Sequence, residues 1–282
     1  MDRYLLRYFL AIVETGNFSR AAARENVAQP TLSAGIAKLE AQLQARLFDR
    51  TNRRVHLTEA GSRFLVHARR IEHEFNLAQA AVSGAAAPEV LRVAVLSTIP
   101  SAMLEQVLSR REPGERVELL EGTEREVLSL LDRGRAEVAL TILRPSTEKY
   151  ASERLYEEGY GLALPADHRL AQAASLRGEE LADEVMMVRR HCEVLAETSR
   201  YFTDRNVRPA FSYRGTSDDR VAALVRAGLG ITVMPDSYRD LGLARVKLEG
   251  FTPRRTIGLA YGDPAVRYRS GGFVQAAREL AA

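Results

Sequence analysis

Apolar residues near the N-terminus follow helical spacing and predict two short helices. Leu5, Phe9 and Ile12 recur every three or four residues, which places them on one helix face. Gly16 follows this pattern, and a glycine just beyond the last turn is typical of a helix end. Ser19 is then predicted to cap a second helix that continues through three consecutive alanines. Such small side chains allow a neighbouring helix to approach closely.

A third helix is predicted directly after the second. Leu32, Ile36, Leu39 and Leu43 are spaced by 4, 3 and 4 residues and form one apolar stripe that is expected to be buried. Pro30 precedes them and suits a first helical turn, where its missing N–H group costs nothing. Two short helices in this order form the helix-turn-helix pattern, whose second helix enters the DNA major groove.

The segment DRTNRRVHLT, which follows Phe48, predicts a short β-wing beside the helices. Its Arg50, Arg53 and Arg54 are placed to reach DNA phosphates or the minor groove. Residues 1–57 carry nine basic and five acidic side chains, whereas the whole chain has a net charge of only +3. A basic head on a near-neutral body favours a polyanion as the partner of the head. A three-helix protein-interaction domain is the alternative.

One long helix is predicted from Thr58, as its N-cap, to about Val82. Its apolar positions fall at intervals of 4, 4, 3, 4, 3 and 4 residues, close to a heptad repeat, at Ala60, Phe64, Ala68, Ile71, Phe75, Ala78 and Val82. A helix of about 25 residues cannot bury both of its faces within one small domain, so a dimerising linker helix is favoured over a core helix. The segment SGAAAP that follows predicts a hinge.

After Pro88, short β-rich runs alternate with helical patterns. The runs are VLRVAVL, RVELLE, AEVALTI, EVMMV, AFSYR and GITVM, and helical segments such as DDRVAALVRAG lie between them. This alternation predicts an α/β fold with a mainly parallel sheet and enough strands for two subdomains. RLYEEGYGLALPADHRLA and RRTIGLAYGDPAV are predicted to cross between these subdomains. The expected domains are a head (1–57), a linker helix with hinge (58–87) and a two-subdomain body (88–282).

About the first 65 residues resemble the winged helix-turn-helix of LysR-type transcriptional regulators. The segments FLAIVETGNFSRAAA, QPTLSAGIAKLEAQL, LFDR and LTEAG match the family in order and spacing. The body is similar to the family's effector-binding domain, which is related in fold to periplasmic binding proteins. The resemblance implies a DNA-binding transcriptional regulator, a small-molecule effector between the subdomains, and a homotetramer built from linker-helix pairs and body pairs. Three positions depart from the family pattern, with Glu25 for a leucine, Ala28 for a capping serine and Gln44 for a glycine.

The third helix has few long polar side chains on the surface opposite its leucine stripe. A helical wheel places Ala34, Ala37 and Ala41 there. The family often carries arginine at the Ala34 position, so that base contact does not transfer to this chain. Bases are expected to be read by the polar side chains of Gln29, Thr31 and Ser33 and by contacts of Thr31 or Ala34 with thymine methyl groups. The wing is expected to sense the width of the groove. The expected DNA-binding residues are Ser19, Arg20, Gln29, Pro30, Thr31, Ser33, Ala34, Lys38, Arg50, Arg53 and Arg54.

Hydroxyl groups follow the first strand of the body and suggest an anion site. Ser97 and Thr98 precede a helix that is predicted to hold Pro100 in its first turn, where free N–H groups bind anions. Thr123 begins the capping box TERE, so its hydroxyl is equally consistent with a structural role. The segments RRHCE and GTSDD follow two later strands and are expected across the site, although Ser217 is alternatively a helix N-cap. The expected effector-binding residues are Ser97, Thr98, Thr123, Arg190, His191, Cys192, Thr216 and Ser217.

A small carboxylate is the candidate effector for this site. Arg189 and Arg190 are expected to approach the hydroxyls of Ser97 and Thr98, and guanidinium groups bind carboxylates well. The alternative is that the arginine pair is solvated on the surface.

Cys192 is the single cysteine of the chain. Arg189, Arg190 and His191 adjoin it, and nearby positive charge makes a thiol more reactive. The dipeptide HC at this place also resembles the peroxide-sensing branch of the family, but that branch uses a second cysteine. A pocket-lining or inert cysteine is therefore favoured over a redox switch.

Other classes of protein have less support in the sequence. The chain has no G-x-S-x-G elbow, no P-loop and no metal-spaced histidine or cysteine group, which argues against an enzyme and predicts neither metal nor cofactor. No segment approaches the ~20 apolar residues of a membrane span. An exported solute-binding protein is opposed by the basic head and the lack of a signal peptide, so a cytoplasmic location is expected.

Overall fold

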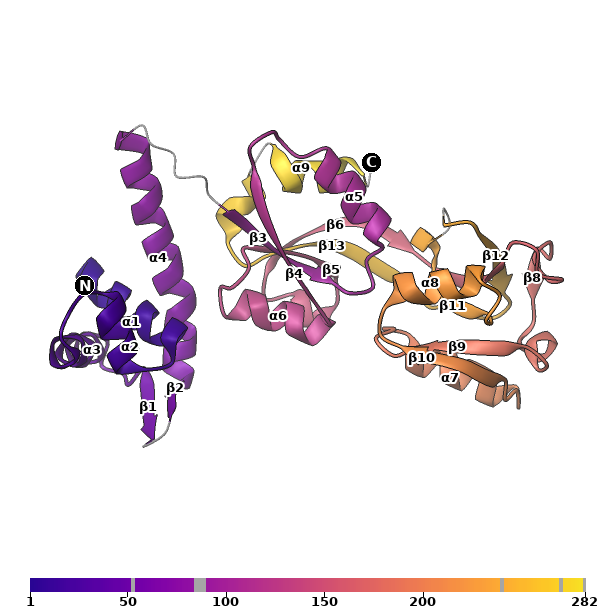
Figure 1. The fold of residues 1–282 in the computed structure, drawn as a ribbon, viewed down its shortest axis with the longest axis horizontal. Helices are drawn as coiled ribbons and strands as arrows, with labels where there is room; N and C mark the ends of the chain where they lie inside the picture. The colour runs from indigo at the N-terminus through magenta and orange to yellow at the C-terminus, as the bar shows by residue number, and fades with distance from the viewer. Residues whose placement is uncertain (52–53, 84–89, 239–240, 269–270, 281–282) are drawn as a thin grey trace. The chain divides into compact units, whose positions relative to one another are not determined.

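The computed structural model describes residues 1–282 apart from 52–53, 84–89, 239–240, 269–270 and 281–282 (Figure 1). The chain divides into two compact units. One contains residues 1–89 with 132–135, and the other contains residues 90–131 with 136–282. Within the described ranges, no helix combines the length and apolarity that a membrane span requires.

The N-terminal unit is a three-helix head with a β-wing and one long helix, as predicted. Phe9 is buried at its centre, with ring centroids 5.2 Å from Phe48 in the wing and 5.0 Å from Phe64 in the long helix. The two wing strands pair antiparallel, with Phe48 opposite Leu57. The elements are α1 (Arg3–Thr15), α2 (Phe18–Arg24), α3 (Gln29–Leu43), β1 (Phe48–Thr51), β2 (Arg54–Leu57) and α4 (Glu59–Ser83).

The first two helices are delimited by Gly16 and Asn17. Gly16 ends α1 in the left-handed conformation with φ 63°, which confirms the prediction. The prediction that Ser19 caps α2 is wrong. Asn17 is the N-cap, and its side-chain oxygen accepts hydrogen bonds from the N–H groups of Ser19 and Arg20 at 2.9 and 3.0 Å. Ser19 instead lies inside the first turn of the helix.

The apolar stripe of α3 is confirmed except at its last position. Leu32, Ile36 and Leu39 are fully buried against α1 and α2, and Pro30 lies in the first turn as predicted. Leu43 is 37% exposed because the last turn of α3 extends past the head core. Gln44 ends the helix with φ 49°, a left-handed conformation that explains why glycine suits this position.

The first subdomain of the body is a five-stranded mixed sheet with helices on both faces. The strand order is β4-β3-β5-β13-β6. One face packs against α5 and α9, which bury Val107 and Phe273, and the other packs against α6, which buries Val127 (Figure 1). The elements are β3 (Val90–Leu96), α5 (Ser101–Ser109), β4 (Arg116–Gly122), α6 (Glu124–Asp132), β5 (Val138–Ile142), η1 (Pro145–Thr147), β6 (Ala151–Glu158), β13 (Arg255–Tyr261), η4 (Pro264–Tyr268) and α9 (Gly272–Glu279).

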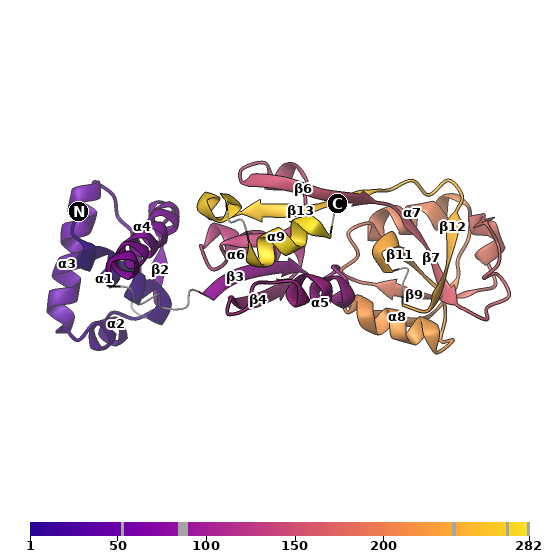
Figure 2. The ribbon, with the colours of Figure 1, turned by 90° about the horizontal axis from the view of Figure 1, so that it is seen from above.

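The second subdomain is built around the strand order β11-β7-β12-β8 and a parallel pair, β9 and β10. A bridge between Met186 and Ile231 links the two sets of strands. α7 and α8 lie on opposite sides of these strands and bury Phe202 and Val225 respectively (Figure 2). The elements are β7 (Tyr160–Pro165), β8 (Ser175–Leu176), η2 (Gly178–Leu181), β9 (Val185–Arg189), α7 (Leu195–Asp204), β10 (Ala210–Gly215), α8 (Asp218–Arg226), β11 (Thr232–Pro235), η3 (Asp236–Tyr238) and β12 (Leu243–Leu248).

Two segments cross between the subdomains, as predicted. β6 ends at Glu158 and β7 begins at Tyr160, while β12 ends at Leu248 and β13 begins at Arg255. The expectation of a mainly parallel sheet is wrong. β13 runs antiparallel to β5 and β6, and β11 and β12 run antiparallel to β7. Both sheets are mixed because β13 and β7, which follow the two crossings, run in the opposite direction to the strands beside them.

Candidate DNA-binding surface and effector site

The outer surface of α2 and α3 presents mainly small and short polar side chains. Ser33 is half-buried, and its hydroxyl oxygen lies 3.3 Å from the Gln29 side-chain nitrogen, which donates a hydrogen bond to it. Ala28 precedes α3 without a side-chain cap, so the first N–H groups of the helix remain available to a phosphate. The predicted DNA-binding residues that are solvent-exposed here are Ser19, Arg20, Gln29, Pro30, Thr31, Ala34 and Lys38.

The cationic side chains of the head differ in whether they form an ion pair with a neighbouring carboxylate. Lys38 Nζ lies 2.9 Å from the Asp2 carboxylate, and Lys38 lowers the pKa of that carboxyl group. Arg7 pairs with Glu25 at 2.8 Å, which gives the unusual glutamate of α2 a surface partner. The Arg20 side chain is exposed and makes no hydrogen bond or ion pair with another described residue, although its backbone N–H group donates to Asn17. Arg20 is therefore the better-placed cation of α2 for a DNA phosphate.

The wing is fixed to α3 by a carboxylate that sequence analysis missed. Glu40 Oε1 accepts a hydrogen bond from the Leu47 N–H group at 2.7 Å, so the chain entering β1 is tied to the third helix. Arg50 lies in β1 and Arg54 in β2, while Arg53 lies outside the described residues. The backbone thus places two of the three wing arginines on the hairpin that follows α3.

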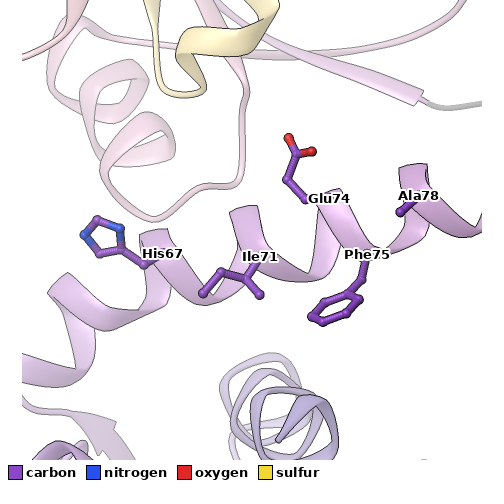
Figure 3. Close-up of a pocket in the computed structure, with 5 residues that line it drawn as sticks. All are labelled: His67, Ile71, Glu74, Phe75 and Ala78. Carbon is purple, nitrogen blue, oxygen red and sulfur yellow. The ribbon is translucent and has the colours of Figure 1, made fainter. Parts of the chain in front are cut away.

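The apolar stripe predicted along α4 packs against the head core at Phe64, Ala68 and Ile71 and is exposed at Phe75 and Ala78. Thr58 caps the helix as predicted, because its hydroxyl oxygen accepts a hydrogen bond from the Gly61 N–H group at 2.9 Å. Phe75 is 44% exposed, which is unusual for a large apolar side chain. One face of α4 carries a hollow lined by His67, Ile71, Glu74, Phe75 and Ala78 (Figure 3). This spacing matches the seam of a helix that pairs with another helix.

Thr98, just after β3, faces a carboxylate rather than the expected arginines. Its hydroxyl oxygen accepts a hydrogen bond from Arg255 Nη1 at 2.9 Å and lies 3.5 Å from Glu193 Oε1. The hydroxyl of Ser97 is buried and has no hydrogen-bond partner among the described residues. Pro100 is the N-cap of α5, not a first-turn residue as predicted. An anion at the Thr98 hydroxyl would lie against Glu193, a like charge that the predicted carboxylate site did not include.

Arg255 is the centre of a buried charge cluster where the two crossings meet. Its side chain is 1% exposed and pairs with Glu158 at 2.8 Å and with Glu193. Tyr160 donates a hydrogen bond to Glu193 at 2.9 Å, and the Ser237 N–H group donates to Glu158 at 2.6 Å. Burial alone lowers the pKa of Arg255, but Glu193 and Glu158 raise it by more, so the guanidinium stays charged. The sequence does not predict this cluster, because its one local signal is the arginine pair Arg254–Arg255 at a crossing.

Arg189 and Asp218 form a second buried ion pair, within the second subdomain and close enough to Glu193 to lower the pKa of that carboxyl group. Their side chains are 2% and 1% exposed, and Arg189 Nε donates to Asp218 Oδ1 at 2.8 Å. Arg189 Nη1 also donates to the Val233 carbonyl oxygen at 3.1 Å. The expectation that Arg189 approaches Ser97 and Thr98 is therefore wrong. Arg190 and His191, which follow β9, are exposed.

Two of the remaining predicted hydroxyls have local structural partners. Thr123 Oγ1 and the Thr123 N–H group both donate to Glu126 Oε2 at 2.8 Å, so this hydroxyl belongs to the start of α6. Ser217 is the N-cap of α8 and accepts a hydrogen bond from the Arg220 N–H group at 3.3 Å. Thr216 is exposed beside it. Thr123 and Ser217 thus have the structural roles at helix starts that were given as alternatives to effector binding.

The thiol of Cys192 is half-buried beside Arg189. Its Sγ atom lies 3.4 Å from Arg189 Nη1. Burial raises the pKa of the thiol and the Arg189 guanidinium lowers it by less, so the pKa is raised overall. The predicted activation by neighbouring arginines is therefore outweighed. Among the described residues, no three His, Cys, Asp or Glu side chains are grouped as metal ligands.

Comparisons with known proteins agree with this architecture in both the head and the body. The family model "Bacterial regulatory helix-turn-helix protein, lysR family" matches residues 4–62, and the model "LysR substrate binding domain" matches residues 85–280. A probable hydrogen peroxide-inducible genes activator of Mycobacterium avium is 30% identical over 98% of this chain and 91% of its own length. The HTH-type transcriptional regulator XapR of Escherichia coli is 32% identical over 85% of this chain and 84% of its own.

A solved structure shares the fold as well. ArgP from Mycobacterium tuberculosis superposes with a TM-score of 0.79 at 19% sequence identity, covering 100% of this chain and 98% of that one. The order of helix-turn-helix, wing, long helix and two-subdomain α/β body is therefore shared. The chain belongs to the LysR family of DNA-binding transcriptional regulators, with an N-terminal helix-turn-helix domain and a C-terminal effector-binding domain.

Proposed function

We propose that this protein is a cytoplasmic LysR-type regulator whose DNA binding is controlled by a small molecule held between the two subdomains of the body. The family consists of transcriptional regulators, which are not enzymes. The domain boundaries proposed from the sequence, 1–57, 58–87 and 88–282, assign DNA binding, dimerisation and effector binding to separate parts. The observation that carries the proposal is the exposed, uncapped α3 followed by a wing that Glu40 ties to it.

The DNA-binding proposal rests on the division between phosphate and base contacts. Arg20 and the wing arginines are cations that suit phosphates, whereas Gln29, Thr31 and Ala34 lie on the exposed face of α3. Short side chains at these positions leave room for close approach to base edges in the major groove. We propose that Thr31 and Gln29 contact bases and that Ala34 contacts a thymine methyl group.

The first prediction separates these two kinds of contact. Arg20→Ala and Arg53→Ala should each lower the slope of log affinity against log salt concentration by about one. Thr31→Ala should keep the slope and change the preferred base at one position, at a cost of about 1–3 kcal/mol. The measurement is fluorescence anisotropy on sites selected from random DNA, with the exposed body residue Arg110→Ala as control. An unchanged slope in both arginine variants would remove these side chains from the DNA interface.

The effector proposal places the ligand at the junction of the two crossings. Ser97, Thr98 and Glu193 lie there, and the carboxyl ends of strands are where ligands bind in related α/β folds. A ligand that prefers one arrangement of the two subdomains shifts the population toward that arrangement, by no more than its difference in affinity. An assembly of paired α4 helices, and from these a tetramer, is proposed as the means by which the shift reaches the heads.

Peroxide sensing is the second candidate function. Several similar proteins are named hydrogen peroxide-inducible genes activators, including those of Dickeya chrysanthemi and Mycobacterium avium. Cys192 and its contact with Arg189 are the features of this chain that favour the candidate. The raised pKa of the thiol opposes it, because the thiolate is the form that reacts with peroxide.

The second prediction tests the reactivity of Cys192. Because the pKa of the thiol is raised, its thiolate fraction at neutral pH should be below that of an exposed cysteine and should grow as pH rises through the raised value. Iodoacetamide labelling followed by mass spectrometry should therefore be slow at neutral pH and faster in alkaline buffer. Peroxide should leave DNA binding unchanged in the wild type and in Cys192→Ser. Rapid oxidation of Cys192 at neutral pH, together with a peroxide-dependent change in DNA binding that Cys192→Ser abolishes, would make peroxide sensing the favoured function.

A further inference from the structure

The Glu193 carboxylate has one oxygen that the protein leaves unused. Its side chain is 5% exposed, and Oε1 takes contacts from Arg255, from Tyr160 at 2.9 Å and from Thr98 at 3.5 Å. Oε2 is buried and has no hydrogen-bond partner among the described residues. An unsatisfied buried acceptor is costly, more so when it carries charge. Because this oxygen is screened from bulk water, a donor that satisfies it has to lie between the two subdomains.

The charges around Glu193 favour a positively charged donor. The buried ion pairs of the junction contain two guanidinium groups, Arg189 and Arg255, and three carboxylates, Glu158, Glu193 and Asp218. Burial raises the pKa of Glu193, but Arg255 and Arg189 lower it by more, so the carboxylate stays ionised. The cluster therefore holds one excess negative charge. A cation neutralises that excess, whereas an anion adds to it.

A second unused acceptor lies next to this contact in the chain. The Ser97 hydroxyl is buried and has no hydrogen-bond partner among the described residues, and Ser97 directly precedes Thr98. A hydroxyl oxygen offers lone pairs to a donor, as the free carboxylate oxygen does. Groups with several N–H donors, such as an ammonium or a guanidinium, can serve more than one such acceptor, which a single hydroxyl donor cannot.

We propose that the effector is an organic cation carrying a primary ammonium or guanidinium group, which Glu193 Oε2 recognises and Ser97 assists. The proposal rests on the proposed effector site between the subdomains and names the chemical class of its ligand. Glu193 is then the specificity-determining residue, because it supplies both the charge and the free acceptor. Arg255 and Tyr160 hold the carboxylate in place through its other oxygen.

The test compares small cations with a carboxylate of similar size on the full-length protein. Propylammonium, ethylguanidinium and butyrate are added at about 10 mM and matched ionic strength, and the unfolding temperature is recorded, since a ligand stabilises the state it binds. Both cations should raise the unfolding temperature of the wild type, and butyrate should not. Glu193→Gln should lose this protection. Glu197→Gln, which removes the same charge from an exposed position on α7, should keep it.

Ser97→Ala provides a second variant that should fold normally. Removing a buried hydroxyl without a partner costs little stability, so any loss of cation protection in this variant reports on binding. We expect its calorimetric affinity for propylammonium to fall several-fold. Equal protection of the wild type and Glu193→Gln would mean that the free oxygen serves only structural water, and would overturn the proposal.

The remaining outcomes separate this proposal from the function on which it rests. Absence of protection by both cations in the wild type would overturn the cationic class. Protection by butyrate alone would also overturn it, while a DNA affinity that changes with butyrate would support effector control itself. DNA binding that no bound probe alters would instead count against the proposed function.

Discussion

Asp218→Ala is expected to lower the free energy of unfolding of the body by about 3–5 kcal/mol. Asp218 accepts two hydrogen bonds from the Arg189 guanidinium, and both side chains are almost completely buried. Without the carboxylate, Arg189 keeps the Val233 carbonyl oxygen and the weak Cys192 contact but loses the carboxylate that pairs with it directly. A buried, unpaired guanidinium is among the most destabilising single changes in a protein. Urea unfolding followed by circular dichroism measures the loss.

A neighbouring aspartate provides the control. Asp219 is exposed and contacts the exposed Ser101 hydroxyl of the other subdomain, so Asp219→Ala should cost less than about 1 kcal/mol. The double variant Arg189→Met with Asp218→Leu should recover much of the lost stability, because replacing both partners leaves no unpaired charge. Equal losses in Asp218→Ala and Asp219→Ala would show that the buried pair does not hold the subdomain together.

Phe75→Asp combined with Ala78→Asp is expected to separate paired linker helices. Both side chains are exposed on the face of α4 shown in Figure 3, so an isolated chain should tolerate the changes. In a helix pair the same positions lie in the apolar seam, where two carboxylates should raise the dimer dissociation constant by at least about 100-fold, or about 3 kcal/mol. The affinity for an operator with two half-sites should fall as the dimer dissociates, because a single head binds only one half-site.

The choice of positions in this experiment follows from the structure. Ile71, also predicted in the seam, packs against the core of the head, so an aspartate there would unfold the head as well. Ser62→Asp is the control, since Ser62 is exposed near the start of α4 and away from the stripe. Sedimentation velocity measures the assembly. A double variant that sediments as the wild type does would show that α4 is not the dimer interface.

The order and type of the elements followed well from hydrophobic spacing, because local periodicity decides which face of a helix or strand is buried. The stripe at Leu32, Ile36 and Leu39 and the strand VLRVAVL are examples. Errors arose where the surrounding structure, rather than local spacing, decided which residue is buried or caps a helix. Leu43 is exposed because the head core ends before the last turn of α3. Ser19 was predicted as a cap because serine suits that role, but Asn17 lies where the backbone turns into the helix.

The effector site could not be predicted in the same way. Thr98, Glu193 and Arg255 meet at one point, although they lie in three distant segments and no local pattern relates them. A paired "RR" run reads as surface charge, yet Arg255 is buried at a crossing and Arg189 is buried against Asp218. Residue types therefore predicted polar and charged groups in this region of the fold, but the pairing of charges, on which the proposed sign of the ligand rests, depended on the tertiary structure.

The two crossings have a consequence for how the protein is made. Ile142 in β5 pairs with Ile257 in β13, which is synthesised about 115 residues later, after the whole second subdomain. At roughly 5–20 residues per second, the nascent chain carries an unpaired β5 edge for on the order of ten seconds. Unpaired strand edges invite aggregation. Until β13 has been synthesised, the nascent chain is therefore open to edge-to-edge association at β5.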